Sequence, residues 1–359
     1  MSPNPDEFPA PAPEDAAVPT PAEEVFRSTG APPPFALGYA SVPRIPLAEE
    51  SRQVLPDQFL RSAYPRDRVW LHALLFVATL LTTSLVGMEH WGSFQFMLGK
   101  LPAGTSLWAL VPGALWYSVG LLAILGAHEM GHYLACVHYR INASLPYFLP
   151  VPPPFIAGTM GAFIKIRQPI RSKKQLFDIG IAGPLAGFVV AVPVLFLGLA
   201  LSTVIPTPKG LEVREYADPL LFKLVSWLVL GHVRDGFIVA AHPLVFAAWF
   251  GCLATSLNLF PIGQLDGGHI SYAVLGRHST RVTYAALATA VALTFVSLSW
   301  LVWTVIMAAM LYAFGPQHPR TIDEELPIGR ARLWLAVCAM VILVLCFMPK
   351  PIDEVILGH

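Results

Sequence analysis

The sequence predicts an all-α polytopic membrane protein, a bundle of about six to eight transmembrane helices. Two observations indicate this class. The chain of 359 residues is 55% hydrophobic and only 13% charged, with a mean hydropathy of +0.59, whereas about a quarter of the residues in an average soluble domain are charged. Apolar runs of the ~20 residues that a spanning helix needs also recur along the chain. The net charge is zero, so we expect no nucleic-acid partner.

The first expected segment is a cytoplasmic tail over residues 1–64. Ten prolines lie within residues 1–34, among six acidic residues. A segment of this composition cannot bury enough apolar surface to offset its ordering entropy, so we expect it to be disordered. It lacks the apolar core of a signal peptide and is too acidic for a transit peptide.

Seven apolar segments follow within residues 65–350, which we take as one transmembrane domain ahead of a short C-terminal tail over 351–359. Spans are expected at residues 69–86, 106–137, 176–204, 242–260, 282–314 and 333–347, and the weaker segment 219–230 is expected at the interface. Residues 282–314 suit one steep helix or two short ones, and a break near Ser297-Leu298-Ser299 is favoured. Gly183-x-x-x-Gly187 is expected to form a tight helix-packing face.

Basic residues orient these segments. Lys and Arg cluster before the first span, between the second and third, around residues 277–281 and over residues 320–332. Cytoplasmic loops of membrane proteins are enriched in Lys and Arg. We therefore expect a multi-pass protein of the cell (inner) membrane with a cytoplasmic N-terminus.

The most informative motif is His128-Glu129-Met130-Gly131-His132, which lies inside the apolar run 106–137. Two histidines four residues apart face the same side of a helix and can share a zinc ion, and the glutamate can act as general base on a water molecule. Ionisable groups inside a membrane segment are costly and usually functional. The motif therefore predicts a zinc hydrolase whose active site lies within the membrane.

Two histidines leave a catalytic zinc site short of one protein ligand. Asp266 follows an inward-running span, so it is expected at the same membrane depth as the histidines. Asn258 and Pro261 are expected to end the preceding helix, and Gly267-Gly268 to let the backbone approach the metal closely. An aspartate before two glycines is more often a turn residue, but its pairing with the histidine motif favours a ligand.

These motifs together resemble those of the site-2 protease family of intramembrane zinc metalloproteases. The resemblance rests on residues 128–132 and on Asn258-x-x-Pro261-x-x-x-Leu265-Asp266-Gly267. A third block, residues 158–166 followed by 177–187, is similar to the branch found in cyanobacteria and plant plastids. The resemblance covers about residues 65–350.

The resemblance implies an intramembrane metalloendopeptidase that carries out regulated intramembrane proteolysis. Its substrate would be a single-pass or membrane-anchored protein within the lipid bilayer, and it would hold one Zn²⁺ per chain. The implied zinc ligands are His128, His132 and Asp266. Glu129 is implied to activate the zinc-bound water as the catalytic base, and Asn258 to contact the substrate backbone or the developing oxyanion.

The resemblance also implies a re-entrant β-hairpin-like segment at residues 158–166 that pairs with an unwound substrate strand. The residues themselves agree, since Gly-rich and β-branched sequences with an exposed edge suit strand addition. An ordinary loop packed on the bundle is the alternative. The residues expected to bind substrate in this way are Gly158, Thr159, Met160, Gly161, Ala162 and Phe163.

Two other function classes stay open at this point. One is a transporter whose buried polar residues line a path, and the other is an inactive relative that binds membrane partners. The convergence of polar residues on one metal site argues against the first, and the intact catalytic positions argue against the second. No PDZ domain is expected, because residues 205–241 are too few for an independent domain of ~50 residues.

Overall fold

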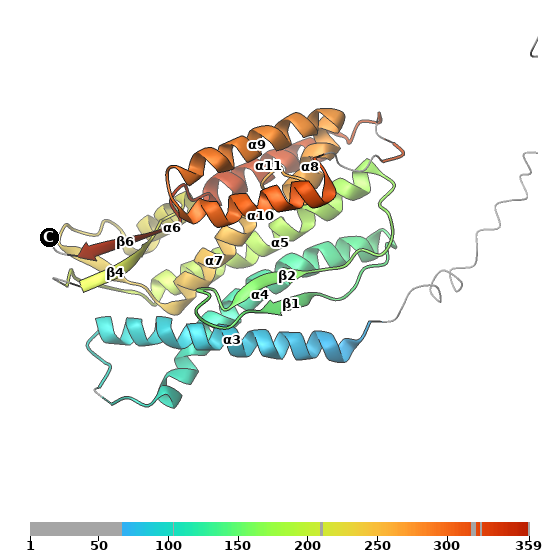
Figure 1. The fold of residues 1–359 in the computed structure, drawn as a ribbon. Coiled ribbons are helices and arrows are strands. Elements are labelled where there is room, and N and C mark those ends of the chain that lie inside the picture. Colours follow the sequence, from blue (N-terminus) through green and yellow to red (C-terminus); the bar gives the residue numbers. More distant parts are fainter. Residues whose placement is uncertain (1–66, 103, 209–210, 317–320, 324, 358–359) are drawn as a thin grey trace, which may run out of the picture. The chain divides into compact units, whose positions relative to one another are not determined.

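Three long apolar helices, α3 (Val69–Met97), α4 (Val111–His138) and α5 (Lys173–Ala200), lie along one another (Figure 1). The computed structural model describes residues 67–102, 104–208, 211–316, 321–323 and 325–357, so the tail expected over 1–64 lies outside it. By length and composition all three helices can cross a membrane. They correspond to the first three expected spans.

Helix α3 runs to Met97 instead of ending at the expected residue 86. It continues through His90, which is buried between α4 and the later helix α7 (Pro243–Asn258). The His90 ring stacks on Phe246 with the ring centroids 4.3 Å apart, and its centroid lies 4.9 Å from that of Tyr117. Neighbouring helices therefore cover the polar residue, so it does not end the helix.

Serine side chains cap the turn η2, which precedes α4, and the start of α5. Ser106 accepts a hydrogen bond from the Trp108 N–H and opens the short turn η2 (Leu107–Leu110), which leads into α4. Ser172 accepts from the Lys174 N–H at the start of α5. The Asp323 carboxylate also accepts from the Lys173 N–H and the Ser172 hydroxyl. Burial raises the pKa of Asp323, but these hydrogen bonds outweigh it and hold that pKa below its ordinary value.

The later part of the chain forms shorter helices. They are α6 (Leu220–Leu230), α7, α8 (Asp266–Leu275), η3 (Gly276–His278), α9 (Ser279–Thr294), α10 (Ser299–Phe314) and α11 (Arg330–Cys346). The favoured break within residues 282–314 is present, because α9 ends at Thr294 and α10 begins at Ser299 and packs back on it.

The expected number of spanning helices is not confirmed. In the described part of the chain three helices are long and apolar enough to span, while residues 220–230, 243–258 and 299–313 form apolar helices of 10–17 residues. A helix rises 1.5 Å per residue, so these shorter helices cover less than the ~30 Å hydrocarbon core. The structure is also not purely helical, because it contains three two-stranded antiparallel sheets.

The first sheet joins β1 (Tyr147–Pro150) to β2 (Thr159–Phe163), with Tyr147 opposite Phe163. Strand β1 lies against α3, and β2 contacts α4 (Figure 1). A hairpin was expected at residues 158–166, whereas the observed strand pair spans residues 147–163 and only β2 lies within the expected range. Its re-entrant position in a membrane stays a prediction.

The other two sheets are also antiparallel pairs. One joins β3 (Thr203–Pro206) to β5 (Phe237–Ala240), and the other joins β4 (Leu211–Tyr216) to β6 (Ile352–Leu357). Residues 351–359 were expected to be a short tail, whereas residues 352–357 form a strand. Its partner strand precedes it by more than a hundred residues, so no local pattern indicates the pairing.

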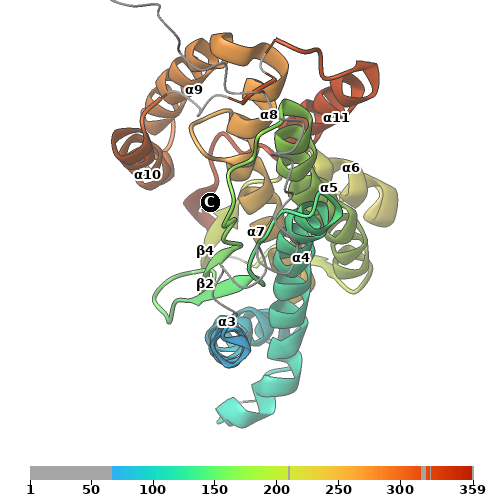
Figure 2. The same ribbon diagram turned by 90° about the vertical axis from the view of Figure 1, so that its right-hand side faces the viewer.

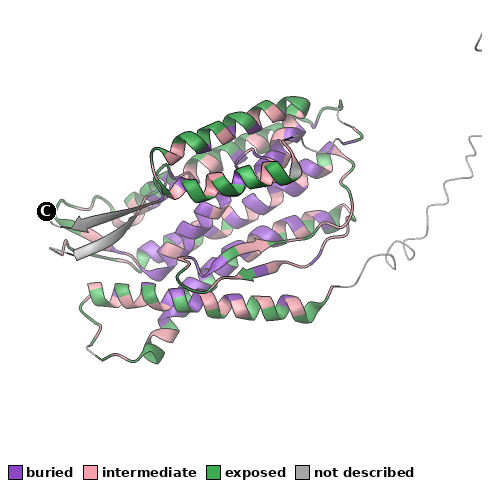
Figure 3. Cartoon of the chain, in the orientation of Figure 1, coloured by how far each residue is buried: buried purple, intermediate pink, exposed green. Residues whose placement is uncertain are grey.

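Helix α7 lies at the centre of the bundle although it has only 16 residues. Of these, 13 are buried, and the end-on view places α7 beside α4 and α5 (Figure 2). Buried residues gather on these inner helices, while exposed residues cover α9, α10 and the outer face of α3 (Figure 3). The packing around α7 therefore fixes the position of Asn258, the site residue at the end of this helix.

An ion pair at one end of the bundle connects three helices. Arg332 at the start of α11 donates two hydrogen bonds to the Asp178 carboxylate of α5, at 2.8 and 2.6 Å. The Tyr139 hydroxyl, at the end of α4, donates to the same carboxylate. Bidentate pairs of this kind fix geometry as well as contributing energy.

Asp178→Asn should lower the free energy of unfolding by about 1–3 kcal/mol, because it leaves the Arg332 guanidinium without its charged partner. Unfolding by SDS titration in mixed micelles measures this. Glu325→Gln, at an exposed position, is the matched control and should change little. Equal unfolding midpoints for the two variants would contradict the role of the pair.

Candidate metal centre

Helix α4 carries the first part of the site. His128, Glu129 and His132 are all buried. The two imidazole Nε2 atoms lie 3.1 Å apart, with the ring centroids 4.9 Å apart. The i, i+4 spacing therefore brings both ring nitrogens to one point, as the motif predicts.

Asp266, the first residue of α8, completes the group. Its Oδ2 atom lies 3.1 Å from His128 Nε2 and 3.3 Å from His132 Nε2. The ligand atoms of these three residues all lie within 4.8 Å of one another. Ligand atoms at 2.0–2.1 Å from a tetrahedral zinc ion are separated by roughly 3.3 Å, so the three residues fit such a metal.

The loop between α7 and α8 delivers Asp266. Helix α7 ends at Asn258, and Gly263 has φ of 54°, which favours glycine. A Cβ atom on Gly267 would lie 2.0 Å from the Leu259 carbonyl oxygen, and one on Gly268 would lie 2.3 Å from that of Gly263. The two glycines were expected to let the backbone approach the metal. The close approach is instead to the preceding loop, which folds under the start of α8.

Helix α5 orients His132 through its backbone. The His132 Nδ1 atom lies 2.7 Å from the Ile179 carbonyl oxygen. A carbonyl only accepts, so Nδ1 carries the proton and Nε2 presents a lone pair toward His128 and Asp266. Such backbone partners fix the tautomer of metal-binding histidines. No sequence pattern predicts this contact, because the carbonyl of any residue can make it.

The glycines of the expected packing face lie directly on the two histidines. A Cβ atom on Gly183 would be 2.1 Å from His132 Nε2, and one on Gly187 would be 3.2 Å from the His128 Cβ. The α4–α5 contact is thus a packing face, as predicted, and it also sets the space that the imidazoles occupy.

Two further groups surround the histidines. The Glu129 carboxylate accepts a hydrogen bond from the Ile164 backbone N–H, just beyond β2. The Asn258 Nδ2 atom, at the end of α7, lies 3.3 Å from His128 Nε2. Asn258 was predicted from its motif, whereas the Ile164 N–H has no signature in the sequence.

A cavity of about 150 Å³ opens beside these residues. His128, Glu129 and Asn258 line it together with Met160, Gly161 and Ala162 of β2. Asn258 and three of the six hairpin residues expected to bind substrate therefore line the cavity.

The other three residues of that group have structural contacts. Gly158 has φ of 73°, and a Cβ atom there would lie 2.8 Å from the Thr82 carbonyl oxygen of α3. The Thr159 hydroxyl donates to the Leu149 carbonyl, and Phe163 stacks on Tyr147. These contacts hold the hairpin against itself and against α3.

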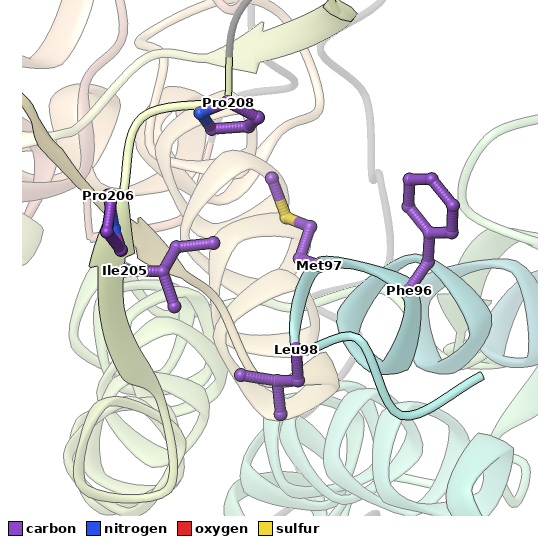
Figure 4. A pocket seen from close by; sticks show the side chains of 6 residues that line it. All are labelled: Phe96, Met97, Leu98, Ile205, Pro206 and Pro208. Carbon is purple, nitrogen blue, oxygen red and sulfur yellow. The ribbon is translucent and has the colours of Figure 1, made fainter.

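A larger cavity of about 290 Å³ lies elsewhere, between the end of α3 and β3 (Figure 4). Its lining residues are Phe96, Met97, Leu98, Ile205, Pro206 and Pro208. None of these six carries a titratable group, so the smaller cavity is the candidate site for chemistry.

Comparison with known families agrees with this geometry. Peptidase family M50 matches residues 116–302, which include every residue of the metal centre. The chain belongs to peptidase family M50. Its membership accounts for the resemblance to the site-2 proteases noted in the sequence.

Two plant proteins are among its relatives. The chain is 32% identical over 262 residues to the probable zinc metalloprotease EGY1, chloroplastic, of Oryza sativa subsp. japonica, and 30% identical over 255 residues to that of Arabidopsis thaliana. These matches cover 70% and 68% of this chain and 43% and 44% of the relatives. The chain thus spans less than half the length of these relatives. No solved structure matches it.

Gly183→Ala should lower metal affinity by about 10–100-fold, because the added methyl group displaces the His132 imidazole. Gly92→Ala is the matched control, since the nearest atom to its Cβ is 3.7 Å away. Metal content of the purified variants after dialysis against graded chelator measures the effect. Equal retention of metal by the two variants would show that the imidazole does not depend on the glycine.

Proposed function

We propose that this protein is an intramembrane zinc metalloendopeptidase that cleaves membrane protein substrates. The observation that carries the proposal is the group His128, His132 and Asp266, which lies beside a cavity that His128, Glu129 and Asn258 line. The group is placed among apolar helices. The relatives named as zinc metalloproteases support it. The domain at residues 65–350 would hold the whole site.

The three ligands would hold one zinc ion per chain. Two imidazoles and a carboxylate are the donors of a catalytic zinc site, which keeps a further position open. A bound zinc ion supplies Lewis-acid chemistry: it polarises a carbonyl group and makes water acidic enough to attack near neutral pH. The cavity beside the ligands gives a substrate access to that position.

Glu129 would act as the general base. Its carboxylate lines the cavity and is held by the Ile164 N–H. In the reaction the oxygen of water bonds to the scissile carbonyl carbon, Glu129 takes a water proton, and the proton passes to the amine nitrogen as the C–N bond breaks. Asn258, whose amide nitrogen lies beside the metal centre, would donate to the developing oxyanion or to the substrate backbone.

The substrate would be a single-pass or membrane-anchored protein, in the process called regulated intramembrane proteolysis. A transmembrane helix keeps its carbonyls hydrogen-bonded, so it must unwind locally before cleavage. Strand β2 would bind the unwound segment by strand addition, because Met160, Gly161 and Ala162 line the cavity. In this proposal the hairpin is a re-entrant element of the membrane domain, and its role is to bind the unwound substrate strand.

The proposed orientation places the N-terminus in the cytoplasm of a cell with this protein in its inner membrane. It is supported by the basic clusters, several of which meet at one end of the bundle. There Arg167 pairs with Asp67 and Arg332 pairs with Asp178. The metal motif lies in the last three turns of α4, near that end.

Glu129→Gln should reduce cleavage by about 10²–10⁴-fold, the usual contribution of a general base, while bound zinc stays at one per chain. The measurement is cleavage of a single-pass reporter protein in proteoliposomes, with zinc content determined on the same preparations. Glu89→Gln, at an exposed position on α3, is the matched control and should cleave like the wild type. Turnover by Glu129→Gln near that of the control would exclude Glu129 as the base.

Strand addition predicts an alternating dependence on substrate backbone N–H groups. Along a strand, successive N–H groups point to opposite edges, so only every second one can face β2. We expect N-methylation of single amides in a synthetic substrate to slow cleavage at alternate positions, by about tenfold per lost hydrogen bond. An effect that is uniform along the substrate would count against pairing with β2.

A further inference from the structure

One face of helix α7 forms part of the cavity wall, starting beside the metal centre. Gly251, Ala254, Thr255 and Asn258 all line it, and their spacing of three, four and seven residues places them on a single helix face. Asn258 ends that face beside His128. The residues that precede Asn258 on this face carry small side chains. The cavity therefore extends along α7 away from the metal centre.

The remaining walls are apolar. Ile124 and Leu125 of α4 form one, Trp303 of α10 forms another, and β2 forms a third. The remaining lining residues are Met160, Gly161 and Ala162 of β2 and Leu257 of α7. The Thr255 hydroxyl donates to the Gly251 carbonyl at 2.9 Å, so its proton is not directed into the cavity. Among the described lining residues, Glu129 and His128 are the titratable ones, and both lie at the metal end. The cavity is thus suited to an uncharged group.

The volume of the cavity limits which side chains it can hold. A cavity of about 150 Å³ in a protein core holds one benzene molecule, so this cavity has room for one aliphatic side chain or one six-membered ring, and a tryptophan exceeds it. A strand paired with β2 directs every second side chain to one face. A residue next to the cleaved bond would therefore project into the cavity.

We infer that this cavity is a size-selective pocket for one medium-sized aliphatic side chain flanking the scissile bond, and that Ala254 and Trp303 set its limits. The inference rests on the proposed function and adds the class of substrate residue. Ala254 is half-buried on the wall, where any larger side chain occupies the cavity. Trp303 is the bulky side chain on the α10 wall, and its removal enlarges the space.

Gly251 is not a suitable probe, although it also lines the cavity. A Cβ atom there would lie 2.8 Å from the Ile124 Cγ2 atom, so a substitution disturbs the contact between α4 and α7. Ala254→Leu and Trp303→Ala change the size of the cavity in opposite directions. Ala288→Leu on α9 and Trp334→Ala on α11, both at exposed positions, are the matched controls.

The experiment uses full-length protein in proteoliposomes with a family of single-pass reporters. The cleavage site of the wild type is first mapped by mass spectrometry, and each residue flanking it is then changed to Ala, Leu, Trp, Asp or Lys. The wild type should prefer Leu at one flanking position and reject Trp, Asp and Lys there. Because a methylene in an apolar pocket changes discrimination by about 10–200-fold, Ala254→Leu should lower the ratio of kcat/KM for Leu over Ala by at least about tenfold. Trp303→Ala should raise the ratio for Trp over Leu by a similar factor.

These ratios separate selection from structural damage, which would slow all reporters together. Unchanged ratios in both variants, with cleavage and zinc content retained, would overturn the pocket. A zinc-loaded wild type that cleaves none of the reporters would instead overturn the proposed function, and the pocket with it. Altered ratios in Ala288→Leu or Trp334→Ala equal to those of the cavity variants would also overturn the assignment of Ala254 and Trp303.

Discussion

Two imidazole nitrogens and a carboxylate oxygen held 3.1–3.3 Å apart inside an apolar bundle are the constraint on which this structure depends. Polar atoms are costly to bury unless they have partners, so the surrounding protein must hold these three in place. Helix α5 does this by approaching α4 at backbone distance: a Cβ atom on Gly131 would lie 2.4 Å from the Ala182 carbonyl oxygen. The same approach brings the Ile179 carbonyl to His132 and leaves room for the imidazoles only where glycines face them.

The sequence predicted the residues that are recognised by type and spacing. The helical spacing of the motif predicted that His128, Glu129 and His132 lie close together. The predicted end of the helix near Asn258 placed Asp266 in the loop that follows it. What it could not predict are contacts made by the backbone, since any residue can supply a carbonyl or an N–H. The Ile179 carbonyl on His132 and the Ile164 N–H on Glu129 belong to this class.

The fold also has features that the sequence predicts and features that it does not. Apolar runs predicted α3, α4 and α5, and the polar break at residues 297–299 predicted the turn between α9 and α10. The extension of α3 to Met97 was not predictable, because it depends on a Phe246 ring more than 150 residues away. Strand β6 and the approach of Trp303 to the cavity likewise depend on neighbours that only the assembled bundle supplies.

The unequal lengths of the helices have a consequence for the surrounding lipid. At 1.5 Å per residue the 29 residues of α3 extend about 44 Å, whereas the 16 residues of α10 extend about 24 Å. Both helices expose apolar side chains, so the two flanks of the protein present different hydrophobic thicknesses to one bilayer. A bilayer meets such a mismatch by thinning or by tilting of the protein. The flank with the shorter helix is that of α10, whose Trp303 lines the cavity beside the metal centre.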